Sequence, residues 1–120
     1  MMNGPLDMEV IEELLDLGDG GDPELLVDLI RMFLEDAPSK LESILDGVSK
    51  RDWEKVERAA HSLKGSSGNL GAIDLQHCAD LFQVSSRKEA ADRLEESVAK
   101  LSKDFSTATD ALRDLLEQYA

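Results

Sequence analysis

The residues that could do chemistry are concentrated around His61, in the stretch 60–72. In a helix, which turns about 100° per residue, His61 lies about 120° from the apolar stripe of this segment, so its ring points out of the core or along its edge. Gly65 and Gly68 share the face of His61, because they follow at i+4 and i+7. Each helical glycine costs about 1 kcal/mol relative to alanine, which indicates that steric access to the imidazole is needed.

Lys64 adds a positive charge beside this histidine, because it lies one turn further along the same helix. A neutral imidazole is a nucleophile near neutral pH, and an ammonium group can neutralise an incoming anion. A single histidine on a helix is more often an ordinary solvated or hydrogen-bonded side chain. The glycines and the lysine reverse that expectation and favour a histidine that carries a phosphoryl group.

The same stretch resembles the histidine-containing phosphotransfer (HPt) domains of bacterial and fungal phosphorelays. The hallmark of that family reads approximately His-x-Leu-Lys-Gly-Ser-x-x-x-Leu-Gly, and the residues that match it here are His61, Leu63, Lys64, Gly65, Ser66, Leu70 and Gly71. The order and spacing of the predicted helices also fit, so the resemblance covers most of the chain. It implies that His61 accepts a phosphoryl group and passes it on.

The resemblance also implies a hydrogen-bond partner for the imidazole. In the family, the helix after the phosphorylated one supplies a Gln or Glu to the ring, and Gln83 falls at that place. A surface glutamine is the alternative. The sequence departs from the commonest pattern here, because the family often has Glu at this position and has its cysteine one residue later than Cys78.

Three further residues are implied as supports for the phosphoryl group. Lys64 would neutralise its charge, and Ser66 could hydrogen-bond either the phosphate or the backbone. Arg87 follows Gln83 by four residues and would contact phosphate if the helix continues, although a turn at 85–86 would misplace it.

Composition excludes several other classes of protein. The chain has 120 residues, a net charge of −13 and one cysteine, Cys78. The acidic balance argues against partners such as nucleic acid or an anionic membrane, and it favours a soluble monomer. We expect a cytoplasmic protein, because the sequence has no pair of cysteines for an internal disulfide, no membrane-spanning run and no signal-peptide pattern.

We expect no cofactor or metal bound by the chain itself. His77 is not at a metal-ligand spacing from His61, and two histidines with one cysteine make a poor zinc site. The sequence shows no glycine-rich nucleotide loop and no kinase motif, so we expect a phosphocarrier and not an enzyme. By the resemblance, Mg²⁺ would be supplied by the partner receiver domain.

The stretch 50–68 departs from the acidic balance of the chain. Five basic residues oppose three acidic ones and give a local charge of +2, the residues being Lys50, Arg51, Lys55, Arg58 and Lys64 against Asp52, Glu54 and Glu57. Some of these side chains are expected to form ion pairs on the helix surface. The others would form a positive patch that attracts an acidic partner.

The elements that must position these residues are helical. Leu and Ala dominate the apolar residues, aromatic residues make up 4% of the chain, and no run alternates like a strand. We predict an all-α fold in one domain over 1–120. An antiparallel four-helix bundle over about 22–120 would follow a short N-terminal helix over about 7–17.

Capping residues and helix breakers mark the predicted boundaries. Asp7, Asp22 and Asp52 are expected to cap the first three helices. Pro38 should kink or briefly break the second helix, which is expected to end near Gly47. The last helix contains a heptad repeat, in which one series is Leu94, Leu101, Ala108 and Leu115.

The sequence thus predicts a phosphorelay carrier whose partners are the receiver domains of hybrid sensor histidine kinases and of response regulators. The opening Met1-Met2 pair favours a free-standing protein. The alternative is a helical binding module that regulates a kinase or a regulator by contact alone, and failure to label His61 would favour it. A metal-dependent bundle enzyme is a poorer fit, because the inward Glu-x-x-His pairs that it needs are missing from the sequence.

Overall fold

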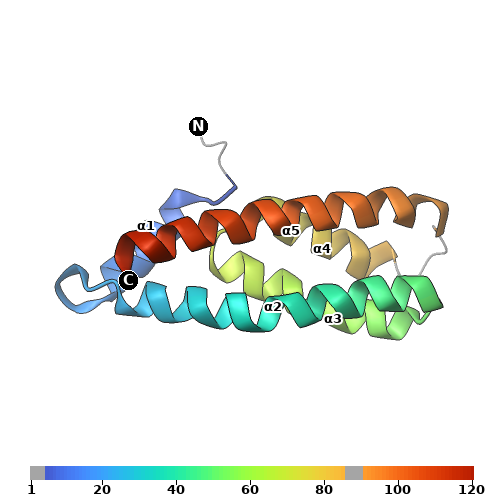
Figure 1. Cartoon of the computed structure of the whole chain (residues 1–120), viewed down its shortest axis with the longest axis horizontal. Helices are drawn as coiled ribbons and strands as arrows, with labels where there is room; N and C mark the ends of the chain where they lie inside the picture. The colour runs from blue at the N-terminus through green and yellow to red at the C-terminus, as the bar shows by residue number, and fades with distance from the viewer. Residues whose placement is uncertain (1–4, 86–90) are drawn as a thin grey trace.

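The computed structural model describes residues 5–85 and 91–120, in which every regular element is a helix. These elements are α1 (Met8–Leu17), the short 3-10 turn η1 (Asp19–Gly21), α2 (Glu24–Lys50), α3 (Trp53–Asn69), α4 (Ile73–Ser85) and α5 (Ala91–Tyr119). The long helices α2 and α5 run side by side, and α3 and α4 form a shorter hairpin beside them (Figure 1). The predicted all-α bundle with a short N-terminal helix is confirmed.

The four helices of the bundle enclose one hydrophobic core. α3 packs against α2 on one side and α4 on the other, and α5 closes the ring by packing against α4 and α2. The core is built from apolar side chains of every α-helix, including Ile11, Leu26, Ile30, Ile44, Val56, Leu63, Leu75, Phe82, Leu101 and Leu112. Burial of such side chains, at about 1.5–3 kcal/mol each, fixes which face of α3 points outward.

The predicted helix caps are present, with one shift. Asp7 accepts a hydrogen bond from the backbone N–H of Glu9 at 3.0 Å, and Asp52 accepts one from Lys55 at 3.2 Å. Asp22 accepts a hydrogen bond from the N–H of Glu24 at 3.0 Å. A cap at Asp22 predicts that α2 begins at Pro23, but the helix begins one residue later, at Glu24. Because caps act within a single turn, the sequence is sufficient to locate them.

Of the kink or brief break expected at Pro38, the break does not occur, because α2 is continuous from residue 24 to residue 50. Pro38 is exposed, whereas Phe33 and Ala37 before it and Ile44 after it are buried in the same core. A helical proline costs about 3 kcal/mol. Burial of apolar residues on both sides of Pro38 outweighs that cost and keeps the helix intact.

The end of α2 also differs from the prediction, because the helix continues past Gly47. This glycine is buried, and a Cβ atom there would lie 2.7 Å from Cγ2 of Val56, so α2 and α3 approach closely at this point. The chain turns instead at Arg51, whose φ of +56° is left-handed. Gly47 is therefore a packing residue and not a helix terminator.

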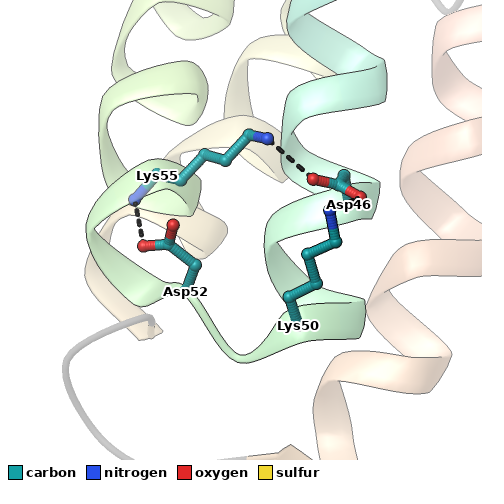
Figure 2. Close-up of polar contacts among 4 residues, drawn as sticks. All are labelled: Asp46, Lys50, Asp52 and Lys55. Atoms are coloured by element: carbon teal, nitrogen blue, oxygen red, sulfur yellow. Dashed lines mark hydrogen bonds and ion pairs between the residues drawn. The ribbon is translucent and has the colours of Figure 1, made fainter.

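The corner between α2 and α3 is held by one carboxylate that binds two lysines (Figure 2). Asp46 lies 2.7 Å from Nζ of Lys55 and 3.2 Å from Nζ of Lys50, and Asp52 caps the start of α3 beside them. The hydrogen bond from Lys55, followed by that from Lys50, lowers the pKa of Asp46 below its ordinary value of 3.8. Two of the five basic residues around the predicted patch are thus paired.

The turn between α3 and α4 is fastened to the N-terminal segment. Gly71 has a φ of +72°, and its carbonyl accepts a hydrogen bond of 2.7 Å from the N–H of Asp7. A Cβ atom at Gly71 would lie 2.9 Å from the carbonyl oxygen of Asp7, so the close contact requires glycine on both counts. The cap of α1 and the end of the α3–α4 hairpin therefore form one unit.

Candidate functional site

His61 projects from the middle of α3 and is exposed to solvent. Its Nδ1 lies 2.9 Å from Nε2 of Gln83, which is in the last turn of α4. The hairpin thus brings together the two residues that the sequence assigns to the same site. Because one ring nitrogen faces Gln83 and the side chain is exposed, Nε2 of His61 is the nitrogen left for an incoming group.

The contact with Gln83 bears on which nitrogen of the ring carries the proton. In the observed orientation the amide of Gln83 donates to Nδ1 of His61, which leaves the imidazole proton on Nε2. If the amide turns over, its oxygen accepts from Nδ1–H, and Nε2 then presents a lone pair. A glutamine can support both tautomers, whereas a glutamate carboxylate supports only the second.

Lys64 lies in the next turn of α3 and binds Asp80 of α4, with 2.9 Å between Nζ and Oδ1. This pair is in register with the His61–Gln83 pair. Lys64 follows His61 by three residues on α3, and Asp80 precedes Gln83 by three residues on the antiparallel α4. Both side chains remain about half exposed, at 38% and 46%. Two polar pairs therefore bridge the surface of the α3–α4 seam, one turn apart.

The two glycines that share the face of His61 have different surroundings. A Cβ atom at Gly65 would meet nothing within 4 Å, so the surface there is open. A Cβ atom at Gly68 would lie 2.5 Å from Nε2 of Gln76, whose side chain covers it. The expectation that Gly68 provides open access is corrected, because a side chain of α4 already occupies that space.

Ser66 does not face His61, although the hallmark stretch includes it. Its hydroxyl donates to the carbonyl of Ser62 at 3.0 Å and accepts from Nζ of Lys40 on α2 at 2.8 Å. Ser66 therefore belongs to the α2 side of α3, and of its two expected partners, phosphate and the backbone, the structure shows the backbone. The neighbouring Ser67 is buried and donates to the carbonyl of Leu63 at 2.6 Å.

One expected site residue is not described by the structure, and one residue at the site was not expected from the sequence. Arg87 lies outside the described residues. Asp80 was missed, although it precedes Gln83 by three residues and so shares its helix face. That spacing was the available signal, but only the packing of α4 against α3 shows that Asp80 meets Lys64.

A basic hollow lies beside the site, between α2 and α3. It has a volume of about 370 Å³ and is lined by Ser39, Lys40, Ser43, Lys55, Arg58 and Ala59. Arg58 is exposed and lies one turn before His61, but Lys40 and Lys55 bind Ser66 and Asp46. The positive patch predicted for this region is thus reduced by pairing, and Arg58 is its exposed member one turn before His61.

The remaining titratable residues do not assemble a metal centre within the described ranges 5–85 and 91–120, which hold no cluster of three or more His, Cys, Asp or Glu side chains. His77 is exposed on α4, and Cys78 is buried beside it. Burial raises the pKa of the Cys78 thiol. None of the helices described is long and apolar enough to cross a membrane.

Several known proteins are similar to this chain. It is 25% identical over 118 residues to pseudo histidine-containing phosphotransfer protein 2 of Oryza sativa subsp. japonica, covering 97% of this chain and 75% of that protein. Histidine-containing phosphotransfer protein 4 of Arabidopsis thaliana is 27% identical over 120 residues, covering 98% of this chain and 91% of that protein.

The fold has a close counterpart among solved structures. Histidine-containing phosphotransfer protein B from Pseudomonas aeruginosa superposes with a TM-score of 0.86 at 22% identity, covering 99% of this chain and all of that one. The family model described as Hpt domain matches residues 28–120, which contain all of α3 and α4. With this match over most of its length, and with a histidine and a glutamine joined across that hairpin, the chain belongs to the Hpt domain family.

Proposed function

We propose that Nε2 of His61 accepts a phosphoryl group from the phospho-aspartate of one receiver domain and passes it to the aspartate of another. The chain is a histidine phosphocarrier of a phosphorelay by its family. The observation that supports the choice of atom is the contact of Gln83 with Nδ1, which leaves Nε2 on the exposed side of the ring. The open surface over Gly65 gives a partner room to approach.

The transfer needs no group from this chain beyond the imidazole and its neighbours. The lone pair of Nε2 attacks phosphorus, the N–P bond forms, and the bond from phosphorus to the acyl oxygen breaks. The electron pair of that bond stays on the carboxylate of the receiver. This step uses the tautomer in which the amide of Gln83 has turned over, so that its oxygen accepts from Nδ1–H and Nε2 carries the lone pair. The proton stays on Nδ1 during the transfer, so the reverse reaction regenerates the same imidazole.

The surroundings of His61 fit a dianionic group. Lys64 is one turn away on the same helix and can reach toward a phosphoryl group on the ring. As the resemblance to the family implies, Mg²⁺ would enter with the acidic pocket of the receiver. We also propose that the protein acts in the cytoplasm and that it is a monomer. The net charge of −13 favours the monomer, because like charges repel one another.

The second candidate function is a module that binds a kinase or regulator without being phosphorylated. One relative has the prefix "pseudo" in its name, so the candidate has to be considered for this chain. The presence of His61, its contact with Gln83 and the neighbouring Lys64 favour the carrier.

Labelling with a phosphorylated receiver domain tests the proposal. A panel of receivers from the same genome, charged with radioactive phosphate in the presence of Mg²⁺, should transfer label that is lost in acid and kept in base, as a phosphoramidate requires. His61→Gln should abolish the label, and His77→Gln should keep it, since His77 is the second histidine of the chain and is also exposed. Persistent label in His61→Gln would contradict the assignment.

A further inference from the structure

Asp80 is a charged residue at the site for which the transfer chemistry described above has no role. Its carboxylate lies 2.9 Å from Nζ of Lys64, which lies one turn after His61 on α3. It also lies one turn from Gln83 on the same face of α4. A negative charge has thus been placed where the site is expected to receive a dianion.

The pairing has two consequences for Lys64. In the unphosphorylated protein, Asp80 holds the ammonium group of Lys64 in an ion pair across the α3–α4 seam. After transfer, a phosphoryl group on Nε2 carries nearly two negative charges and attracts the same ammonium group. Carboxylate and phosphoryl group then compete for one cation, because Asp80 binds Lys64 from α4 and His61 lies one turn from Lys64 on α3.

We propose that Asp80 is a positioning residue that competes with the phosphoryl group for Lys64 and thereby keeps phospho-His61 from becoming too stable to pass its phosphoryl group on. The inference rests on the proposed function of His61. A carrier has to release what it accepts, so a cation that bound the phosphoryl group without competition would favour acceptance and hinder release. The half-exposed Lys64–Asp80 pair gives this competition a moderate strength.

The proposal is tested on the transfer equilibrium between this protein and one phosphorylated receiver. Asp80→Asn keeps the size of the side chain and should shift the equilibrium toward phospho-His61 by about two- to fivefold, as expected for a partly exposed ion pair. The ³¹P chemical shift of phospho-His61 should move as well, because Lys64 would bind the phosphoryl group more closely. Asp80→Glu retains the carboxylate and should restore the wild-type equilibrium.

A double-mutant cycle separates competition from direct repulsion. In a Lys64→Gln background, Asp80→Asn should change neither the equilibrium nor the ³¹P shift, because the contested cation is gone. If the same two- to fivefold shift persists in that background, Asp80 repels phosphate directly and the inference is wrong. An unchanged equilibrium in Asp80→Asn alone would also overturn it.

The chain offers a matched control in Asp46, which binds Lys55 across the other side of α3 (Figure 2). Asp46→Asn removes the same charge and the same kind of ion pair, and should leave the transfer equilibrium unchanged. Circular dichroism should confirm folding of each variant, and Asp80→Ser would replace Asp80→Asn if that variant unfolds. Absence of label in the wild-type protein would reject the proposed function of His61, whereas label with no effect of Asp80→Asn would reject the present inference alone.

Discussion

The two sides of α3 are both lined with polar groups, but those groups are used differently. On the α2 side, Lys55 binds Asp46, and Lys40 binds a hydroxyl that is itself bonded to the backbone of α3. On the α4 side, an amide meets an imidazole, and Lys64 binds the half-exposed Asp80. The α2 side holds two helices together, whereas the α4 side holds groups that can change partners when the ring is modified.

Glycine shows the same contrast in packing. Gly47 on the α2 side lets the Val56 side chain and the backbone of Asp52 come close, and backbone cannot move aside. Gly68 on the α4 side lies under the far end of the flexible Gln76 side chain, which can move. One helix thus has a rigid seam that fixes its position and an adjustable seam that carries the site.

The largest expected effect comes from blocking the approach of the phosphoryl donor to His61 over the open surface at Gly65. Gly65→Leu should keep the fold, since the position is open and leucine favours a helix. It should reduce the rate of transfer to His61 by about 100-fold, because the phosphoryl donor could no longer reach the ring in line. Stopped-flow transfer from a phosphorylated receiver measures the rate, with circular dichroism melting for the fold. Gly65→Ala is the matched control, and an unimpaired rate in Gly65→Leu would show that the partner does not pass over this face.

The packing contrast predicts opposite outcomes for two glycine substitutions. Gly47→Ala should destabilise the protein by about 1–2 kcal/mol, because the new methyl group overlaps Val56 and overpacking exceeds the gain in helix propensity. Gly68→Ala should be neutral or stabilising by up to about 1 kcal/mol, because only the Gln76 amide has to shift. Urea unfolding gives both free energies. Equal losses in the two variants would mean that the seams are equally rigid.

Substitutions of the lysines on the two sides of α3 should differ in their effect on phosphotransfer. Lys64→Ala should weaken the phosphorylated state by about 1.5 kcal/mol, at the low end for a charge-assisted contact because Asp80 competes for the ammonium. Gln83→Ala should cost about 0.5–1 kcal/mol, as for a neutral hydrogen bond, and should slow acceptance more than it weakens the product. Lys55→Ala serves as the control and should leave transfer unchanged. Transfer equilibria and forward rates measure all three, and a loss in Lys55→Ala equal to that in Lys64→Ala would remove the distinction between seams.

The smallest effect concerns acid stability at the α2 corner. Lys55 and Lys50 hold the pKa of folded Asp46 below 3.8, so its ion pairs contribute stability above that pH and lose it as the pH falls through the lower folded value. The difference in unfolding free energy between wild type and Asp46→Asn should therefore shrink below about pH 3.8. Urea unfolding at neutral and acidic pH tests this, with Asp28→Asn, an exposed residue of α2, as control. A difference that stays constant with pH would rule out this role.

Features that depend on a few neighbouring residues could be predicted from the sequence. The caps at Asp7 and Asp52 act within one turn, and the heptad series of α5 places Leu101, Ala108 and Leu115 in the core by periodicity alone. Features that depend on a second helix could not. Continuity of α2 through Pro38 is decided by core burial on both sides of the proline.

The candidate site shows the same division. The outward position of His61 follows from the helical period of α3, and the resemblance to the family located Gln83 near it. The occupant of the space over Gly68 and the partner of Lys64 come from α4, so they depend on the register of the hairpin. Ser66 is in the hallmark stretch, but its position on the helix turns its hydroxyl toward Lys40 of α2.

The bond between the N–H of Asp7 and the carbonyl of Gly71 sets a lower limit on the part of the chain that can be transplanted. The family match begins at residue 28, but Leu6 and Ile11 are buried in the same core as the hairpin that carries His61. A fusion protein built from residues 28–120 would leave the α3–α4 turn without its covering segment and its backbone partner. A fusion that transfers the His61 site to another protein should therefore begin before Leu6, so that α1 is included in the folded unit.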